Sequence, residues 1–297
     1  MQTLSGATTY NTHSRNNPPQ FTVQQGEIFL ANTELCTGNW LNSIHDTWAP
    51  DKSNASNPAV CVAVEGTRPG DMLAVEILEV VPDKIGYTGF ANNPNNLASK
   101  IMQRDWGLNV KTVAICGQYV HWSDKLKLPV KPMVGTLGTA PAERDIGNTY
   151  AGPHGGNLDV QEVAAGSTVY LPVEVEGALL HIGDAHALQG DGEINGSGGI
   201  ECRAQVTLRA TVMPRPKNFR AVRIQNADYI MTVGCEADVN AAFHLACEQM
   251  LSWMVDDYGF SINEAYLLMG QVMESRNTQF VNPTSSYVCK MPKKFLI

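Results

Sequence analysis

The sequence predicts a mainly β fold with an α-helical pair near the C-terminus, a β-rich α+β class. Short runs rich in β-branched residues, each bounded by Gly or Pro, recur along most of the chain. Helical periodicity without internal Gly or Pro is convincing only after residue 237. The 297 residues are 43% hydrophobic and 17% charged, so the chain can bury a sizeable core and has the composition of a globular protein.

The first expected strands lie before residue 83. One covers about residues 27–32, and residues 60–82 indicate two β-segments joined by a Pro-Gly turn. Only the later part of the second segment separates polar from apolar side chains, so we expect a strand with both faces largely covered. Residues 83–109 contain GYTGFANNPNN and little periodicity, which predicts a long loop or a lid near a cleft.

Further strands and the helical pair follow. β-branched runs stand at residues 110–117, 127–135, 167–175 and 200–212. The last run alternates polar and apolar residues, which predicts a half-exposed strand. A helix is expected over 237–259, with Gly259 where a C-terminal cap belongs. Ser261 and Glu264 have capping-box spacing and predict a second helix, antiparallel to the first and packed with it over the β body.

Domain organisation is weakly marked. We expect an N-terminal β-rich domain at 1–145 and a C-terminal domain at 146–297 that carries the glycine-rich loops and the helical pair. The alternative is one continuous domain, because no linker separates the halves clearly.

Composition excludes several classes of partner. The net charge of −8 and the lack of a long basic run argue against nucleic-acid binding. No run of about 18 apolar residues predicts a membrane span, and the polar N-terminus does not resemble a secretory signal. The seven cysteines are odd in number and scattered, without a CxxC pair, so we expect reduced, mostly buried thiols and a cytoplasmic protein.

Two glycine-rich stretches concentrate the groups capable of chemistry. They read GPHGGNLD at 152–159 and HIGDAHALQGDGEINGSGGIE at 181–201. Glycine is kept where the backbone must turn sharply or approach another group closely. The polar side chains in these stretches are His154, Asn157, Asp159, His181, Asp184, His186, Asp191, Glu193 and Glu201. So many carboxylates and imidazoles on short loops predict a hydrolytic or metal site.

Spacing within the second stretch favours two pairs. Asp184 and His186 are two residues apart and share a face of an extended strand, so one can bind a metal while the other orients or assists it. His181 points to the opposite face and is expected to be packed. Asp191 and Glu193 form a carboxylate pair suited to acid–base work or to a hard cation, although Asp191 also fits a simple hairpin turn.

The remaining candidates come from other loops. In the first stretch Asn157 could donate to an oxyanion, or could only form a turn, and Asp159 stands where a strand begins. His45 and Asp46 lie in a polar segment, where one of them is either a further metal ligand or part of a surface loop.

The segments GPHGGNLD and GDAHALQGDGE closely resemble signature segments of the acetamidase/formamidase family. PGDMLAVEI at 69–77 and GTLGTAPA at 135–142 are similar to other recurring segments of that family, in the same order. The resemblance implies a β-rich fold, hydrolysis of small aliphatic amides to carboxylate and ammonia, and homo-oligomers. It also implies a divalent metal, zinc before calcium or magnesium. Hydrolysis of small cyclic amides and non-catalytic binding of a metal or small molecule are the alternatives.

The resemblance also implies roles for individual residues. Asp159 and His186 correspond to metal ligands with Asp184 in support, and Glu193 corresponds to the proton shuttle, with Asp191 beside it. His154 and Asn157 would position the amide oxygen. Where the formamidase branch has an acidic, glycine-containing segment, this chain has NSIHD, which makes His45 a candidate extra ligand and leaves the exact amide open.

Overall fold

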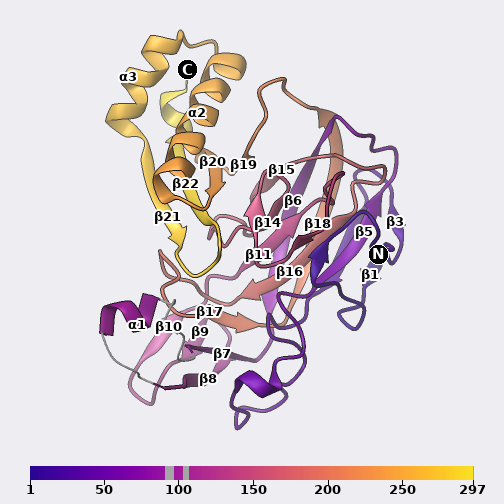
Figure 1. Ribbon diagram of the computed structural model, residues 1–297, viewed down its shortest axis with the longest axis vertical. Coiled ribbons are helices and arrows are strands. Elements are labelled where there is room, and N and C mark those ends of the chain that lie inside the picture. Colours follow the sequence, from indigo (N-terminus) through magenta and orange to yellow (C-terminus); the bar gives the residue numbers. More distant parts are fainter. Residues whose placement is uncertain (91–96, 103–106, 297) are drawn as a thin grey trace.

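Two large β-sheets make up most of the protein, and a helical pair packs at one end (Figure 1). The computed structural model describes residues 1–90, 97–102 and 107–296. The first sheet of this described part has nine strands, in the order β1 (Gln2–Leu4), β4 (Ile28–Asn32), β18 (Ala204–Pro214), β6 (Asp71–Pro82), β15 (Thr168–Pro172), β19 (Val222–Gln225), β20 (Tyr229–Glu236), β22 (Ser285–Pro292) and β21 (Glu274–Gln279).

The second sheet contains eleven of the described strands. Its main path is β10 (Lys127–Pro129), β9 (Tyr119–His121), β8 (Asn109–Cys116), β7 (Ile85–Phe90), β17 (Ser197–Cys202), β16 (Leu180–His186), β11 (Met133–Gly138), β14 (Gly155–Asn157) and β13 (Ala151–Gly152). Off this path, β5 (Ala59–Val64) pairs with β16, and β3 (Thr22–Val23) pairs with β5. A separate small pair joins β2 (Thr12–His13) to β12 (Ile146–Gly147).

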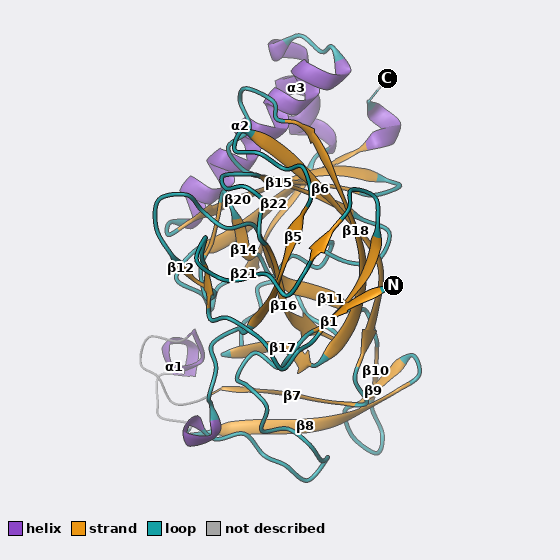
Figure 2. Ribbon diagram, turned by 90° about the vertical axis from the view of Figure 1, so that its right-hand side faces the viewer, coloured by secondary structure: helices purple, strands orange, loops and turns teal. Residues whose placement is uncertain are grey.

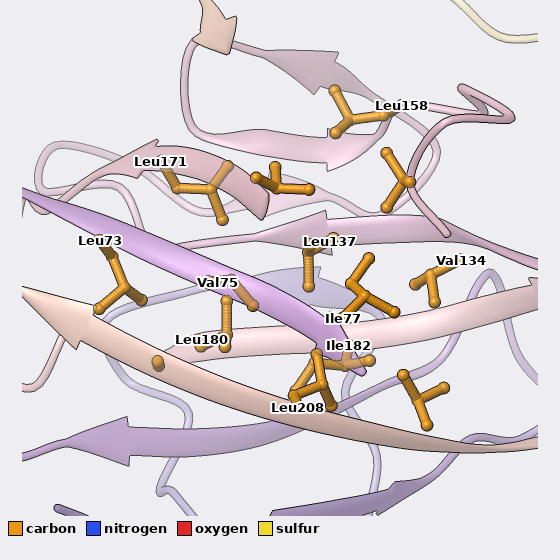
Figure 3. Close-up of a cluster of buried hydrophobic side chains, with 14 of the residues drawn as sticks. Leu73, Val75, Ile77, Val134, Leu137, Leu158, Leu171, Leu180, Ile182 and Leu208 are labelled. Atoms are coloured by element: carbon orange, nitrogen blue, oxygen red, sulfur yellow. The ribbon is translucent and has the colours of Figure 1, made fainter. Parts of the chain in front are cut away.

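The main core lies between the two sheets. Side chains of β6 and β18 point toward those of β11 and β16, as the close-up in Figure 3 shows for Leu73, Leu208, Leu137 and Leu180. These leucines are fully buried, and burying one such side chain stabilises a fold by roughly 1.5–3 kcal/mol. The first half of β6 is covered on both faces, as its unbroken apolar run predicts.

The helical pair is confirmed, including both predicted caps. Helix α2 (Val239–Tyr258) ends at Gly259, which has a φ of 72°, and helix α3 (Ile262–Val272) begins at Ser261, whose hydroxyl accepts from the Glu264 amide. The pair covers β20 and β22 (Figure 2). The other helices are α1 (Leu97–Met102) and the 3-10 turns Pro50–Lys52 and Lys293–Phe295. No helix in the described part of the chain is long and apolar enough to cross a membrane.

Three predictions about strands need correction. The run at 127–135 divides between β10, at the edge of the second sheet, and β11, which lies between β16 and β14. The run at 200–212 is not one strand, because the chain leaves the second sheet after Cys202 and enters the first at Ala204. Arg203 makes the turn there, with its side chain directed to Glu34. The predicted loop at 83–109 is partly strand, since Ile85–Phe90 pairs with both β8 and β17. Residues 91–96 and 103–106 of that loop, where a lid was predicted, lie outside the described residues.

Strands from both sides of residue 145 pair with one another. In the first sheet β6 pairs with β18, and in the second β5 pairs with β16. This interleaving is expected if both halves fold together as one continuous domain, which is the alternative that the sequence leaves open. The domain boundary near residue 145 stays a prediction. None of the seven cysteines, all within the described residues, forms a disulfide.

Candidate metal centre

Four carboxylates and one imidazole meet at the end of β16 in the second sheet. Asp184 and His186 belong to β16, and Glu201 stands opposite His186 on the neighbouring β17. Asp159 follows β14, and Glu193 lies in the loop between β16 and β17. All five side chains belong to residues that are no more than 5% exposed.

The distances join these side chains into one cluster. Nε2 of His186 lies 3.0 Å from Oε2 of Glu201 and 3.4 Å from Oδ1 of Asp184. On the other side, Asp159, His186 and Glu193 offer ligand atoms that all lie within 4.8 Å of one another. His186 is therefore the residue at which the two sides of the cluster meet.

The hydrogen bonds of Gln189 define the state of His186. Nε2 of Gln189 donates to the backbone carbonyls of Asp159 and Thr278, at 2.9 and 3.2 Å. Its Oε1 must then face Nδ1 of His186, 2.9 Å away, so the neutral ring carries its proton on Nδ1. In that state the lone pair of Nε2 points at the carboxylate oxygens of Glu201 and Asp184. A lone pair and carboxylate oxygens at these distances repel each other unless a proton or a metal ion lies between them.

Strained backbone gathers at the same place. A positive φ is uncommon outside glycine and, where the surroundings enforce it, often marks a functional site. Among the described residues, the non-glycine positions with positive φ are Asn57 (46°), Asp159 (47°), Ala178 (56°), Leu179 (49°), Asp184 (53°) and Glu193 (41°). Asp159, Asp184 and Glu193 belong to the cluster, and the Asn57 amide lies 3.4 Å from Oδ2 of Asp184.

Glycines let the backbone approach these side chains closely. A Cβ at Gly135 would lie 2.6 Å from Oδ1 of Asp159 and 2.7 Å from Oδ2 of Asp184. A Cβ at Gly198 would overlap the Glu193 side chain, and one at Gly199 would lie 2.6 Å from Nδ1 of His186. These three glycines thus make room for the carboxylates and the imidazole.

Burial and mutual repulsion shift the pKa values in this cluster. Burial, and then the charge of Asp184, raise the pKa of Asp159 to about 7. Burial, and then Asp159, hold the pKa of Glu193 well above its ordinary value. Burial opposes protonation of His186, but Glu201 and Asp184 outweigh it and hold its pKa well above the usual range. Each shift reflects the cost of placing several negative charges together away from water.

Apart from the contacts of His186 with Asp184 and Glu201, several ligand atoms of the cluster have no hydrogen-bond partner among the described residues. These buried atoms are Oδ1 of Asp159, Oδ1 of Asp184, Nε2 of His186, Oε2 of Glu193 and Oε2 of Glu201. The described donors to the carboxylates are neutral amides, such as Nδ2 of Asn282, 2.7 Å from Oδ2 of Asp159. Unpaired oxygens and an imidazole nitrogen that converge in this way fit a divalent cation.

Cys36 borders the cluster from the loop that follows β4. Its sulfur, with ligand oxygens of Asp184 and Glu201, forms a second group of atoms within 4.8 Å of one another. The residue is 7% exposed, and burial, followed by the charges of Glu201 and Asp184, holds the pKa of the thiol well above its usual range.

Other predicted site residues lie elsewhere. Asp191 is exposed and pairs with Arg276 at 2.7 Å, whereas Glu193 is buried. His45 is exposed in the loop after β4, and neither ligand group found among the described residues contains it. Asn157 is buried next to the site, where Oδ1 accepts from Thr136 at 2.6 Å. His154 is buried against His13, with ring centroids 5.0 Å apart.

Sequence reasoning missed part of the site. The sequence marks Glu201 as a polar residue of the second stretch but predicts no role for it, although its place on the strand paired with His186 brings it to the centre. Gln189 lies inside the same motif, and the spacing of the motif gives no sign of its contact with His186. Cys36 and Asn282 come from distant segments, and no local signal in the sequence indicates where they pack.

Comparisons with known proteins agree on one family. The sequence model of the acetamidase/formamidase family matches residues 149–295, the segment with all five cluster residues. The crystal structure of an acetamidase from Bacillus halodurans has a TM-score of 0.91 at 33% identity and covers 99% of this chain and 98% of that one.

Two sequence relatives have names of the same kind. An acetamidase of Mycolicibacterium smegmatis is 28% identical over 85% of this chain and 82% of its own length. A formamidase of Methylophilus methylotrophus is 28% identical over 39% of this chain and 33% of its own length. Since the similarity to the Bacillus acetamidase extends over nearly the whole of both chains, and the family model covers the cluster, this chain belongs to the acetamidase/formamidase family.

Proposed function

We propose that this protein hydrolyses small aliphatic amides to a carboxylate and ammonia, with a divalent metal bound at the cluster. The observation that carries the proposal is the convergence of five buried ligand atoms whose polar contacts, among the described residues, are those of His186 with Asp184 and Glu201. The substrate class follows from the relatives, which are named acetamidase and formamidase.

The metal would be held by His186 with Asp159 and Asp184, as the resemblance implies, and by Glu201 in addition. His186 fits this role because its Nε2 carries the lone pair and faces the carboxylates. A divalent cation bound there supplies Lewis-acid activation of water and of the amide carbonyl. Zinc is the ion we expect, because it accepts a mixed set of imidazole and carboxylate ligands.

Glu193 would move the proton. Hydrolysis requires a base that takes a proton from the attacking water and an acid that returns it to the departing nitrogen. Glu193 is buried beside Asp159 and His186, and burial, followed by the charge of Asp159, holds its pKa well above the ordinary value of a glutamate. Asn157, two residues before Asp159, is our choice for orienting the amide oxygen, and the same role for His154 stays a prediction.

The test measures ammonia release from formamide, acetamide and larger amides, before and after chelation and after zinc is restored. We expect turnover that disappears on chelation and returns with metal. In Glu193→Gln we expect turnover to fall by roughly 10²–10⁴-fold while metal content is retained, because only proton transfer is removed. Asp191→Asn is the matched variant, and its turnover should stay near normal since that carboxylate is exposed and paired with Arg276.

Two results would contradict the proposal. One is ammonia release that survives complete removal of the metal, and the other is near-normal turnover in Glu193→Gln. If metal is bound but no linear amide reacts, a panel of small lactams tests the cyclic-amide alternative.

We also propose a homo-oligomer in the cytoplasm. Its support is the exposed apolar surface of α3, where Ile262, Tyr266 and Leu267 are each more than 60% exposed. Light scattering during gel filtration determines the mass in solution, and a monomer at micromolar concentration would contradict the prediction.

A further inference from the structure

We infer that Cys36 binds the metal of this centre as a thiolate, together with Asp184 and Glu201. The inference rests on the proposed metal site and extends it, because the thiol decides which class of cation the site prefers. Its sulfur and the two carboxylates offer ligand atoms within 4.8 Å of one another, in the interior of the protein.

Contacts around Cys36 hold the sulfur in place. The Tyr87 hydroxyl lies 3.1 Å from Sγ of Cys36 and is itself fixed by Thr37 at 2.9 Å and Ser197 at 3.1 Å. The loop is tied to the sheet next to it, because Nε of Arg203 lies 2.5 Å from Oε1 of Glu34. A ligand that is positioned before the metal arrives loses little side-chain freedom on binding.

The carboxylates facing Cys36 point to a ligand independently of the sulfur. Oδ1 of Asp184 and Oε2 of Glu201 are buried, and apart from the Cys36 sulfur their polar neighbour among the described residues is Nε2 of His186, at 3.4 and 3.0 Å. Both residues are 3% exposed, so water cannot solvate them freely. An ordinary buried cysteine lies among apolar side chains, whereas this one lies beside two buried carboxylates that share one imidazole nitrogen.

The charge of the cluster supports a cation on the Cys36 side. Asp159, Asp184, Glu193 and Glu201 are all buried, and among the described residues His186 is the basic side chain that contacts them. Burying several negative charges together is costly unless positive charge is bound with them. A cation held by Cys36 as well as by Asp184 and Glu201 would offset part of this negative charge.

Thiolate ligation has a definite chemical consequence. On binding, the S–H bond of Cys36 breaks, a sulfur–metal bond forms and one proton leaves to solvent. Thiolate is a soft ligand and favours zinc, cobalt or iron over magnesium and calcium, which prefer oxygen ligands. Cys36 would therefore select a thiophilic divalent metal in a site otherwise rich in carboxylates.

Cobalt substitution tests the inference with a readout other than activity. Visible d–d absorption of the Co²⁺ protein reports bound metal, and a near-ultraviolet sulfur-to-cobalt charge-transfer band reports thiolate ligation. We expect both in the wild-type protein and in Cys61→Ala, a buried cysteine of β5 outside both ligand groups. In Cys36→Ser we expect the charge-transfer band to be lost and the d–d absorption to remain.

Each outcome separates this inference from the proposed function. The role of Cys36 is overturned if the wild-type protein shows d–d absorption without a charge-transfer band. It is also overturned if the charge-transfer band persists in Cys36→Ser. In either case, ammonia release from amides still decides whether the protein is an amidase. A charge-transfer band that depends on Cys36, in a protein that releases ammonia from no amide, supports the ligand and refutes the proposed function. If Cys36→Ser fails to fold, Cys36→Ala is measured in its place with the same expectation.

Discussion

At the scale of single residues, Gln189 determines how His186 can act. Its amide donates to two backbone carbonyls, so its orientation cannot reverse without losing both bonds. Oε1 then accepts the Nδ1 proton and leaves Nε2 as the nitrogen that faces the carboxylates. Outer contacts of this kind fix the tautomer of a metal-binding histidine and raise its basicity.

Gln189→Met should therefore weaken metal binding by roughly 10–100-fold, the usual effect of losing such a contact. The measurement is a competition titration of zinc against a chelator of known affinity. Gln161→Met is the control, because Gln161 makes its described hydrogen bonds to Asp191 and Arg276 rather than to a residue of the cluster. Equal zinc affinity in wild type and Gln189→Met would refute the positioning role.

Two carboxylate–partner pairs show what residue spacing can and cannot predict. Asp184 and His186 are two residues apart on one strand, and the structure brings their side chains within 3.4 Å. Asp191 and Glu193 have the same spacing, yet one is exposed and the other buried. Gly192 (φ 86°) and Glu193 (φ 41°) leave the extended conformation there, so the rule for a strand no longer applies. Asp184 also leaves the extended conformation, with a φ of 53°, so its closeness to His186 does not follow from strand alternation alone.

At the scale of elements, the sequence predicted the helices better than the strands. Helix α3 carries its own start signal in Ser261 and Glu264, and α2 its own stop signal in Gly259. The break at Arg203 has no such local signal, because apolar alternation continues through it. Which sheet a strand joins depends on distant partners, such as β7 for β17 and β6 for β18. For the same reason, local sequence patterns predict neither the position of Cys36 nor the role of Glu201.

Packing of α2 on β20 depends on Gly234. A Cβ at this position would overlap the backbone carbonyl oxygen of Ala242 in α2, at 1.9 Å. Gly234→Ala should therefore displace the helix and lower the free energy of unfolding by about 1–3 kcal/mol or more, as overpacking does. Urea unfolding followed by circular dichroism measures the change.

Gly270 of α3 provides the matched control. A Cβ there meets no atom within 4 Å, and the position is exposed. Gly270→Ala should raise the free energy of unfolding by roughly 0.5–1 kcal/mol, because alanine loses less backbone entropy in a helix. The two Gly→Ala substitutions are thus expected to act with opposite sign, and an unchanged stability in Gly234→Ala would show that α2 adjusts without cost.

At the scale of the whole molecule, a buried histidine cluster joins the N-terminal segment to the second sheet. His13 of β2 lies against His154 and His181, with ring centroids 5.0 and 4.7 Å away. His181 is held by the Leu179 carbonyl and the Asn17 amide, each at 2.8 Å. Burial, and then His181, lower the pKa of His154 to about 4, and burial lowers that of His181 to about 4.

These lowered pKa values predict a loss of stability in acid. Between about pH 6.5 and 4 the imidazole of His154 binds a proton in the unfolded chain but stays neutral in the folded protein. The contribution of His154 to the stability of the fold is therefore complete above pH 6.5 and decreases progressively below it. The loss for His154 is of order 3 kcal/mol, at about 1.4 kcal/mol per pKa unit. Asp159, whose pKa is raised to about 7, acts with the opposite sign over the same range. The contribution of one histidine must therefore be measured as a difference between proteins.

His154→Phe removes one buried imidazole and keeps an aromatic ring between His13 and its neighbours. The measured quantity is the drop in the free energy of unfolding by urea between about pH 7 and about pH 4.5. We expect this drop to be smaller in His154→Phe than in the wild type, by up to roughly 3 kcal/mol. His121→Gln, at an exposed position of β9, should lose as much as the wild type. If all three proteins lose the same amount, the cluster is not what makes the fold sensitive to acid. If the difference appears only in His154→Phe, a neutral cluster holds the N-terminal segment on the sheet that carries the metal centre.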